Sequence, residues 1–326
     1  MSAGIKEQGS GNGERRPFSV RRALITGATG LIGRQLLSSI EDPVILSRRP
    51  DEARRLLGPV EALLWEPEAG PAPSEALRGV EVVFNLAGEP VSEGRWTSEK
   101  KRRIRDSRVV GTRNLVAGLA ALKSRPRVLV SASAVGYYGD RGDEELDERS
   151  AAGHGFLAEV CTEWEREAMA ASQLGIRVVC VRIGIVLAHN GGALARILIP
   201  FRMGMGGRLG SGRQWMPWIH IKDVAGILLH ASRNNEINGP MNAVAPRPVT
   251  NVDFTRALAH ALHRPALLPV PRTALRLAFG ELSEILIASQ RVFPRVAERT
   301  GYAFEYSDLD GALDYVMSSM AGSSAA

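Results

Sequence analysis

The segment Gly27-Ala28-Thr29-Gly30-Leu31-Ile32-Gly33 constrains the fold more than any other part of this chain. It follows a short apolar run at 23–26 and leads into apolar residues at helical spacing. In such a strand–turn–helix unit, one glycine permits the tight turn, another lets the backbone approach a pyrophosphate, and the third lets helix and strand pack closely. The segment therefore predicts a dinucleotide-binding turn, and the alternative is an ordinary turn between a strand and a helix.

In the rest of the first half of the chain, short apolar runs alternate with longer amphipathic stretches, as they do around the glycine segment. The pattern is typical of βαβ units around a parallel sheet that is buried on both faces. We expect strands at 23–26, 44–47, 62–65, 82–86, 128–132 and 177–187. We expect helices at 31–40, 99–122 and 156–174. The predicted fold is α/β: a Rossmann-type doubly wound parallel sheet with a smaller C-terminal lobe.

The end of the second expected strand indicates which dinucleotide the turn would bind. Enzymes that use NAD place an acidic residue about 20 residues beyond the turn, on the ribose 2′-hydroxyl. Here the position reads Ser47-Arg48-Arg49, and the nearest acids, Glu41 and Asp42, precede the strand. A guanidinium can hold a 2′-phosphate with two hydrogen bonds, whereas a carboxylate would repel it. NADP(H) is therefore the expected cofactor; the alternative is that both arginines are simply solvated.

The later part of the chain is less regular. A glycine-rich stretch at 203–213 precedes a strand-like segment at 215–221, and Pro265, Pro269 and Pro271 mark a linker. We therefore expect a disordered tail at 1–21 and an NADP-binding Rossmann domain at 22–190, with sheet contributions from later segments. A smaller substrate lobe with a C-terminal helical segment is expected at 191–326.

Composition and charge exclude several classes of protein. With 44% hydrophobic residues and no run near the roughly 18 apolar residues of a membrane span, a soluble cytoplasmic protein without membrane contact is expected. The two cysteines, Cys161 and Cys180, suit neither a disulfide framework nor a metal site. Eight of the basic residues lie in 95–113, which reads as a solvated helix face. The alternative is a nucleic-acid contact, against which the acidic stretch 140–148 argues.

Several longer motifs resemble the extended short-chain dehydrogenase/reductase superfamily, and within it the epimerase family proteins of the YfcH type. They are NLAGEPV with RW at 85–96, SRVVGT at 107–112, SASAVGYYGD at 131–140, GSGRQWMPWIHIKDVA at 210–225 and SQRVFP at 289–294. The resemblance covers about 22–318. It implies a Rossmann domain that binds NADP(H), and an oxidoreductase or nucleotide-sugar-epimerase-like activity on a carbonyl or alcohol of unknown identity.

The resemblance also implies roles for individual residues. It assigns the cofactor to Gly27, Thr29, Gly30, Leu31, Ile32, Gly33, Arg48 and Arg49, with Leu86, Ala87, Gly88 and Ser131 at the following strand ends. It places Ser133 where the superfamily keeps a hydroxyl that bonds the substrate oxygen. The alternative for Ser133 is a hydroxyl satisfied at the end of a strand.

The superfamily's catalytic pair is missing. A tyrosine normally transfers the proton, and a lysine four residues later lowers the tyrosine pKa and holds the nicotinamide ribose. When Glu165 is aligned with the glutamate that usually follows, Leu157 takes the tyrosine position and Cys161 the lysine position. None of the five tyrosines of the chain has a lysine four residues later.

Two groups of aromatic residues are candidates for the remaining roles. Tyr137 and Tyr138 follow Ser133 at the carboxyl end of an expected strand, where α/β sheets bind their ligands, so either could supply a phenol. The alternative is a turn that stacks on the cofactor or closes the pocket. Trp96, Trp215 and Trp218 lie beside glycine-rich loops and could line the substrate pocket, or could pack in the core.

The expected partner is a small-molecule substrate, with no nucleic acid, no membrane and no metal, and the oligomeric state stays open between monomer and homodimer. The leading hypothesis is an NADP(H)-dependent oxidoreductase or epimerase-like enzyme that uses Ser133 with Tyr137 or Tyr138. Its rival is a non-catalytic NADP(H)-binding sensor or scaffold protein. The missing tyrosine–lysine pair favours the rival, and the glycine turn and the arginines fit both.

Overall fold

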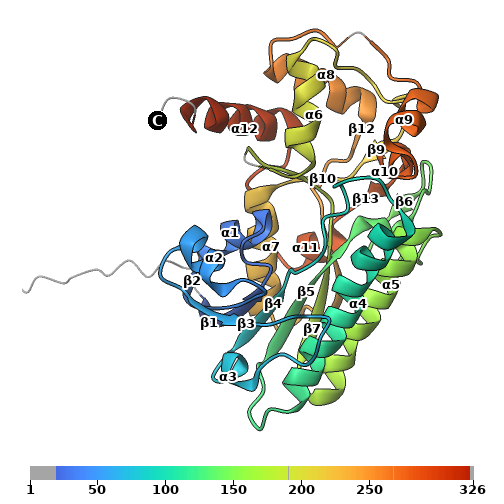
Figure 1. The fold of residues 1–326 in the computed structure, drawn as a ribbon. Coiled ribbons are helices and arrows are strands. Elements are labelled where there is room, and N and C mark those ends of the chain that lie inside the picture. The colour runs from blue at the N-terminus through green and yellow to red at the C-terminus, as the bar shows by residue number, and fades with distance from the viewer. Residues whose placement is uncertain (1–19, 190, 267, 324–326) are drawn as a thin grey trace, which may run out of the picture.

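The computed structural model describes residues 20–189, 191–266 and 268–323, and it is built around a seven-stranded parallel sheet (Figure 1). The strand order is β11-β7-β5-β4-β1-β2-β3, with the first strand near the centre. This confirms the Rossmann-type fold. The strands are β1 Val20–Thr26, β2 Ile40–Ser47, β3 Glu61–Leu64, β4 Val82–Asn85, β5 Val128–Ala134, β7 Arg177–Ile183 and β11 Gly239–Ala243.

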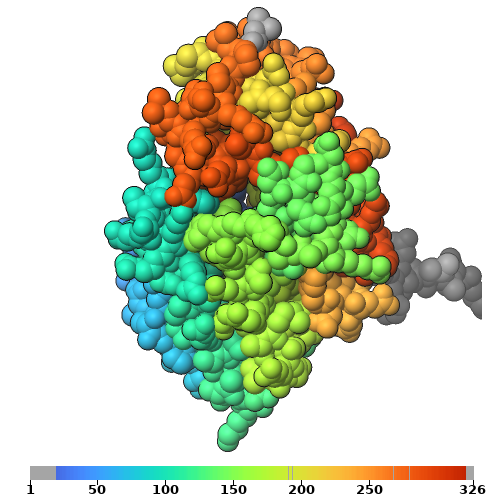
Figure 2. Space-filling view, turned by 90° about the vertical axis from the view of Figure 1, so that its right-hand side faces the viewer, coloured from blue at the N-terminus to red at the C-terminus, as the bar shows by residue number. Residues whose placement is uncertain are grey.

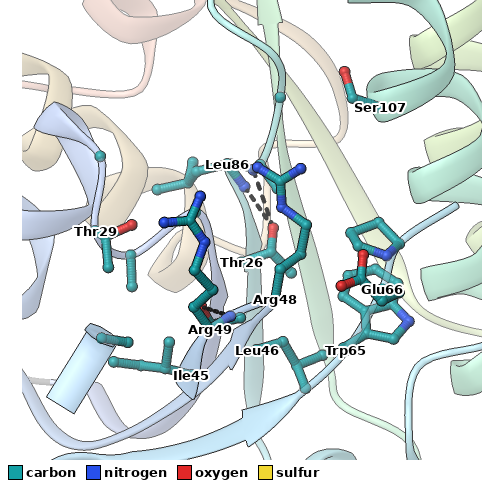
Figure 3. A pocket seen from close by; sticks show the side chains of 18 of the residues that line it. Thr26, Thr29, Ile45, Leu46, Arg48, Arg49, Trp65, Glu66, Leu86 and Ser107 are labelled. Carbon is teal, nitrogen blue, oxygen red and sulfur yellow. Dashed lines mark hydrogen bonds between the residues drawn. The ribbon is translucent and has the colours of Figure 1, made fainter. Parts of the chain in front are cut away.

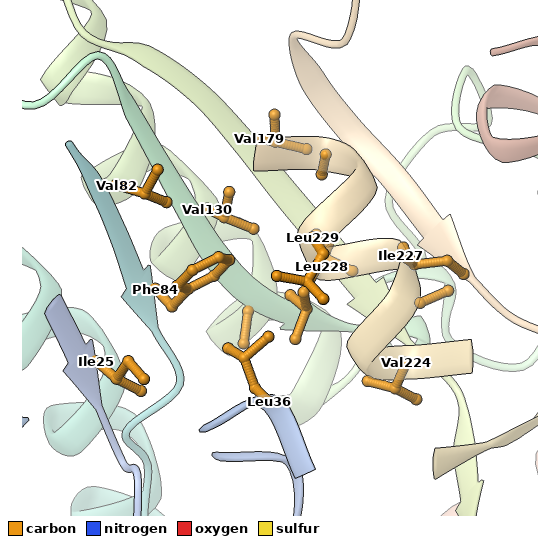
Figure 4. Packing of buried hydrophobic residues seen from close by; sticks show 14 of the residues in the cluster. Ile25, Leu36, Val82, Phe84, Val130, Val179, Val224, Ile227, Leu228 and Leu229 are labelled. Atoms are coloured by element: carbon orange, nitrogen blue, oxygen red, sulfur yellow. The ribbon is translucent and has the colours of Figure 1, made fainter. Parts of the chain in front are cut away.

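Helices cover both faces of the sheet because both faces of its strands are apolar. On one face α7 packs Val224, Ile227 and Leu228 against Phe84 and Val130, with Leu36 of α1 beside them (Figure 4). On the other face Leu115 and Leu119 of α4 pack against Leu24, Val83 and Leu129. The helices of these layers are α1 Leu31–Leu37, α2 Pro50–Leu57, α3 Ser74–Leu77, α4 Ser98–Ala120, α5 Phe156–Met169, α7 Ile221–Arg233 and α11 Arg295–Arg299.

The smaller lobe lies beyond the carboxyl ends of the strands, at the top of Figure 1. Its apolar core joins Leu194 and Leu198 of α6 to Phe254 of α8 and Leu313 of α12. The lobe contains β8 Ile185–Leu187, α6 Gly192–Arg202, β9 Trp215–Met216, β10 Trp218–His220, β12 Val249–Thr250, α8 Asn251–Ala261, α9 Arg272–Phe279, α10 Leu282–Ile287 and α12 Leu309–Ser323. Between lobe and sheet lie η1 Val135–Tyr138, β6 Glu145–Leu146 and β13 Arg291–Val292, whereas η2 Ala170–Leu174 follows α5 and packs against α4 before the start of β7.

The strand expected at 177–187 is two strands, because the chain changes sheets at Gly184. The Gly184 N–H still bonds to Ala243 O of β11 at 3.0 Å, but the Ile185 N–H bonds to Pro217 O at 2.7 Å. From there β8 pairs with β10 in the lobe. A Cβ at position 184 would lie 2.2 Å from Pro217 O, so only glycine allows this crossing.

The two lobes are not consecutive in sequence. After β10 the chain returns to the sheet as α7 and β11 before it builds α8 and the rest of the lobe. At the other end, β1 begins at Val20, so the last two residues of the expected tail belong to this strand, and 1–19 lie outside the described residues. This topology places the ends of β1, β2, β4 and β5 beneath the lobe, where an open α/β sheet binds its ligands.

Candidate functional site

A cavity of about 810 Å³ lies over the carboxyl ends of β1, β2, β3 and β4 (Figure 3). Its floor is the glycine turn, and one wall is α4. Of the predicted cofactor residues, those that line it are Gly27, Thr29, Gly30, Arg48, Arg49, Leu86, Ala87 and Gly88. Residues that are distant in sequence thus enclose one space large enough for a dinucleotide's adenosine half.

The glycine turn leaves no room for side chains. Gly27 has a φ of 70°, and a Cβ there would lie 2.8 Å from the Leu86 carbonyl carbon. A Cβ on Gly33 would lie 2.5 Å from Gly27 O, so Gly33 lets α1 pack against the turn from behind the cavity wall. The Thr26 hydroxyl accepts hydrogen bonds from the Leu86 and Ala87 N–H groups at 3.0 and 3.1 Å. That contact fixes the loop after β4 against the end of β1.

Besides Gly33, three predicted cofactor residues do not line the cavity. Leu31 and Ile32 are half-buried in the first turn of α1, and Leu31 also lies beneath the start of α6, since a Cβ on Gly192 would lie 3.0 Å from it. Ser131 is fully buried within β5, where its hydroxyl accepts a hydrogen bond from Asn85 Nδ2 at 3.1 Å. Ser131 therefore joins the polar core beneath the cavity rather than its surface.

The arginine pair extends from the end of β2 into the cavity (Figure 3). Ser47 Oγ accepts the Arg49 N–H at 3.0 Å, and the Arg49 guanidinium pairs with Glu52 at 2.7 Å. Arg48 has no ion pair among the described residues. A guanidinium without a carboxylate at this position suits an anionic group of the ligand.

Sequence reasoning missed the far wall of the cavity. Trp65, Glu66 and Pro67 follow β3, and Arg103 and Ser107 lie one turn apart on α4. Glu89 accepts a hydrogen bond from Lys100 Nζ at 2.7 Å, which lowers the Glu89 pKa. The spacing of Arg103 and Ser107, four residues apart on a helix after β4, is a signal that could have found this wall.

At the end of β5, Ser133 belongs to a buried polar network. Its hydroxyl donates to Glu165 Oε1 of α5 at 2.6 Å, and it is 3% exposed. Two nitrogens of Arg182, on β7, donate to the two Glu165 oxygens at 2.8 Å each. The Ser133 proton is therefore committed to Glu165, and the free capacity of the Ser133 oxygen is to accept a hydrogen bond.

The two adjacent tyrosines lie in different environments. Tyr138 is fully buried, and its hydroxyl donates to Asn242 Oδ1 at 2.7 Å. Burial raises the Tyr138 pKa to about 12, so this environment contradicts its predicted proton-transfer role and makes it part of the packing. Tyr137 is half-buried, and the Arg182 guanidinium carbon lies 3.5 Å from its ring centroid. Arg182 is thus the nearby cation that sequence reasoning did not find.

The three tryptophans predicted to line the substrate pocket also lie in three different environments. Trp96 packs edge-on against Phe156 with ring centroids 5.2 Å apart. Trp215 donates to Asp143 at 2.9 Å. Trp218 is 1% exposed in the lobe core, which contradicts a pocket-wall role.

Figure 2 shows a hollow where α5 (yellow-green), the green segment near 140–150 and the orange part of the lobe meet.

Other candidate chemistry is limited in the part of the chain that the structure describes. No group of three or more His, Cys, Asp or Glu side chains there could hold a metal ion. No helix there is long and apolar enough to cross a membrane. Cys161 and Cys180 are buried free thiols, and burial raises the Cys161 pKa to about 11.

Comparison with known proteins gives the same assignment as the fold and the cavity. Residues 23–243 match the model of the NAD dependent epimerase/dehydratase family. The chain belongs to this family. Residues 270–316 match a domain of unknown function, DUF1731. Because Tyr-x-x-x-Lys is absent, the chain is an atypical extended member of the short-chain dehydrogenase/reductase superfamily.

Similar family members cover nearly the whole chain. Epimerase family protein Mb2239 of Mycobacterium bovis is 41% identical over 294 residues, which are 89% of this chain and 96% of the relative. Epimerase family protein YfhF of Bacillus subtilis is 37% identical over 298 residues, 90% of this chain and 97% of the relative. The crystal structure of human epimerase family protein SDR39U1 with NADPH has a TM-score of 0.80 and 34% identity, and covers 91% of this chain and 99% of that one.

Proposed function

We propose that this family member is an NADP(H)-dependent oxidoreductase or epimerase-like enzyme that acts on a carbonyl or alcohol group of a small molecule. The observation that carries the proposal is the cavity, which combines a glycine turn with two arginines at the end of β2. The turn suits a pyrophosphate, and the arginines suit a 2′-phosphate. Human SDR39U1, solved with NADPH, supports the same cofactor here.

The chain's own residues fit this cofactor in shape and charge. Gly27, Gly30 and Gly88 keep the backbone of the cavity wall free of side chains, and Arg48 brings a guanidinium that has no ion pair with any residue the structure describes. When bound, NADP(H) supplies or accepts the hydride. The protein's contribution is to hold it, to position the substrate oxygen and to exclude water.

Two residues suit contact with the substrate oxygen. Ser133 Oγ can accept a hydrogen bond from a substrate alcohol, because its own proton is donated to Glu165. Tyr137 follows in η1 with Arg182 against its ring and is the phenol we assign to proton transfer. Tyr138 is not assigned proton transfer because its side chain is buried.

Deuteride transfer tests the proposed activity. Purified protein is incubated with C4-deuterated NADPH and a pool of cell metabolites, and products are searched by mass spectrometry for deuterium. A labelled product that disappears with Ser133→Ala or Tyr137→Phe, while NADPH affinity is kept, supports the proposal. Label that persists in both variants removes this site from the mechanism.

The second candidate function is a non-catalytic NADP(H)-binding sensor or scaffold. The specific observation that favours it is that α5 has a half-buried leucine, Leu157, and a buried thiol, Cys161, at the two expected catalytic positions, and so offers neither a phenol nor an ammonium there. It predicts NADPH binding with no labelled product from any pool. Equal binding of NADPH by the protein and by the Ser133→Ala variant, with no label in either, supports this function.

A further inference from the structure

A further arginine near the cofactor cavity, Arg108 on α4, is packed between α4 and α5. Its Nη1 donates to the Glu89 carbonyl oxygen at 2.9 Å and to the Ile104 carbonyl oxygen at 3.0 Å. Its guanidinium carbon lies 5.2 Å from the Trp164 ring centroid on α5. The guanidinium is therefore held by two carbonyl oxygens and lies near the Trp164 ring.

Arg108 has no carboxylate partner among the described residues. The nearest acid, Glu89, is engaged by Lys100 at 2.7 Å and by Arg103 at 3.6 Å. Nη2 and Nε of Arg108 have no hydrogen bond to any described residue, and burial lowers the Arg108 pKa. Because the Arg108 side chain is only half-buried, these unused donors are open to the acceptor oxygens of a ligand.

The guanidinium lies against Gly88, which lines the cofactor cavity. A Cβ on Gly88 would lie 2.9 Å from Arg108 Cζ and 3.0 Å from Nη2, so only a glycine at this cavity wall allows Arg108 its position. Gly88 follows β4, the strand where the sheet order turns away from β1, β2 and β3. The adenosine half of a dinucleotide covers the β1–β3 side of such a sheet, and the nicotinamide half covers the β4–β5 side.

On α5, the neighbour of Arg108 is the Cys161 thiol. Cys161 lies near both Ser133 Oγ and the Arg108 guanidinium. Cys161 occupies the position at which the superfamily's lysine is expected from the sequence comparison above. Because the thiol is buried and neutral, α5 brings no cation to this point, and Arg108 brings one from the opposite helix.

We propose that Arg108 replaces the missing lysine and holds the ribose hydroxyls of the nicotinamide half of NADP(H). Ribose hydroxyl oxygens are acceptors that two unused guanidinium donors can reach together. The proposal rests on the cofactor of the proposed function and not on turnover. A failure of deuteride transfer therefore leaves it intact.

The test compares two ligands of the full-length protein by titration calorimetry. NADPH carries the nicotinamide ribose, whereas adenosine 2′,5′-bisphosphate carries only the adenosine half. Arg108→Gln is expected to lower the affinity for NADPH by about 10-fold to 100-fold and the affinity for the bisphosphate by less than about 2-fold. Arg102→Gln, which removes an exposed charge from the same helix, is the matched control and should change neither affinity. Equal losses for both ligands, or no loss for either, would overturn the proposal.

A double variant that moves the positive charge from α4 to α5 gives an independent test. Cys161→Lys, introduced together with Arg108→Gln, restores a cation from the α5 side, so NADPH affinity should recover by at least about 10-fold over Arg108→Gln alone. No recovery in a double variant whose thermal unfolding matches the single variant contradicts the assignment. If Arg108→Gln does not fold, Arg108→Lys is titrated with the same two ligands. A loss confined to NADPH then supports the proposal, and equal affinities overturn it.

Discussion

At the scale of single residues, Glu165 organises the polar groups at the end of β5. It accepts the Ser133 proton on one oxygen and is bridged by Arg182 through both. The Arg182 side chain is 3% exposed and that of Glu165 is 12% exposed, so neither charge is well hydrated. Arg182 in turn donates to Tyr138 and lies on the ring of Tyr137. One carboxylate thus fixes both the packing tyrosine and the proposed catalytic one.

Removal of that carboxylate should destabilise the fold. Glu165→Gln keeps the volume but leaves Arg182 as a buried cation without a counter-ion, so the free energy of unfolding should fall by about 3 kcal/mol. Urea unfolding measures the change. Glu163→Gln on the same helix breaks a more exposed pair with Arg105, and its effect should stay below about 1 kcal/mol. Equal effects of the two substitutions would contradict the role given to Glu165.

Arg48 decides between the two nicotinamide dinucleotides in the proposed site. Arg48→Ala removes a guanidinium that lines the cavity and forms no ion pair within the described part of the chain. NADPH affinity should fall by about 10-fold to 100-fold, whereas NADH, which has no 2′-phosphate, should change by less than about 2-fold. Fluorescence titration of both nucleotides measures this, with the exposed Arg55→Ala as the control. A parallel loss for NADH would mean that Arg48 holds another part of the cofactor.

At the scale of elements, apolar periodicity predicted the strands because a parallel sheet buries both of their faces. The expected runs at 23–26, 44–47 and 128–132 all lie within β1, β2 and β5. The break at Gly184 could not be predicted, because it depends on Pro217 O approaching from the lobe. The burial of Tyr138 could not be predicted either, because its hydrogen-bond partner Asn242 lies 104 residues further along the chain.

The start of α7 should make stability depend on pH. His220 caps this helix: its Nδ1 accepts the Lys222 N–H at 3.3 Å, and its ring is fully buried. Burial and the Lys222 charge lower the His220 pKa to about 4, so the unfolded chain, with a pKa near 6.5, binds the proton more tightly. The contribution of His220 is present above pH 6.5 and is lost as the pH falls towards 4.

The loss from His220 should reach up to about 3 kcal/mol between pH 7 and pH 4. His220→Asn keeps an acceptor at the cap but does not titrate, so its unfolding free energy should fall less steeply over that range. Urea unfolding at several pH values measures both slopes. His260→Asn, on the exposed face of α8, should leave the slope unchanged. The same slope in His220→Asn and the parent protein would exclude His220 as the cause.

At the scale of the whole molecule, the candidate site could be predicted only in part. The glycine turn and Arg48 were found because they follow strands in local sequence patterns. The wall of the cavity formed by α4 and the contacts of the lobe with the segment after β4 depend on pairs that are distant in sequence. Arg95 Nη2, for example, donates to Leu277 O at 3.3 Å across 182 residues. Single-sequence patterns carry no information on such pairs, because each partner is an ordinary surface residue in its own helix or loop.

The segment 87–97, between β4 and α4, connects the cavity to the lobe. Its first residues line the cavity, and the lobe holds its later part: Arg196 of α6 bonds to Ser92 O, and Lys101, just beyond the segment, pairs with Glu281. The Arg196 and Glu281 side chains are each about half exposed, so each contact adds at most about 1 kcal/mol to stability. Their effect should instead appear in the mobility of the segment over the cofactor.

Loosening these contacts should therefore speed cofactor release without unfolding the protein. In a variant with Arg196→Gln and Glu281→Gln, the unfolding free energy should fall by less than about 2 kcal/mol. The dissociation rate constant of NADPH should rise several-fold, because affinity changes of this kind act mainly on dissociation. Stopped-flow displacement of bound NADPH measures the rate, and Arg256→Gln on α8 is the control for loss of lobe charge. An unchanged rate constant would show that the segment is held by its own packing, chiefly Trp96 against Phe156, and not by the lobe.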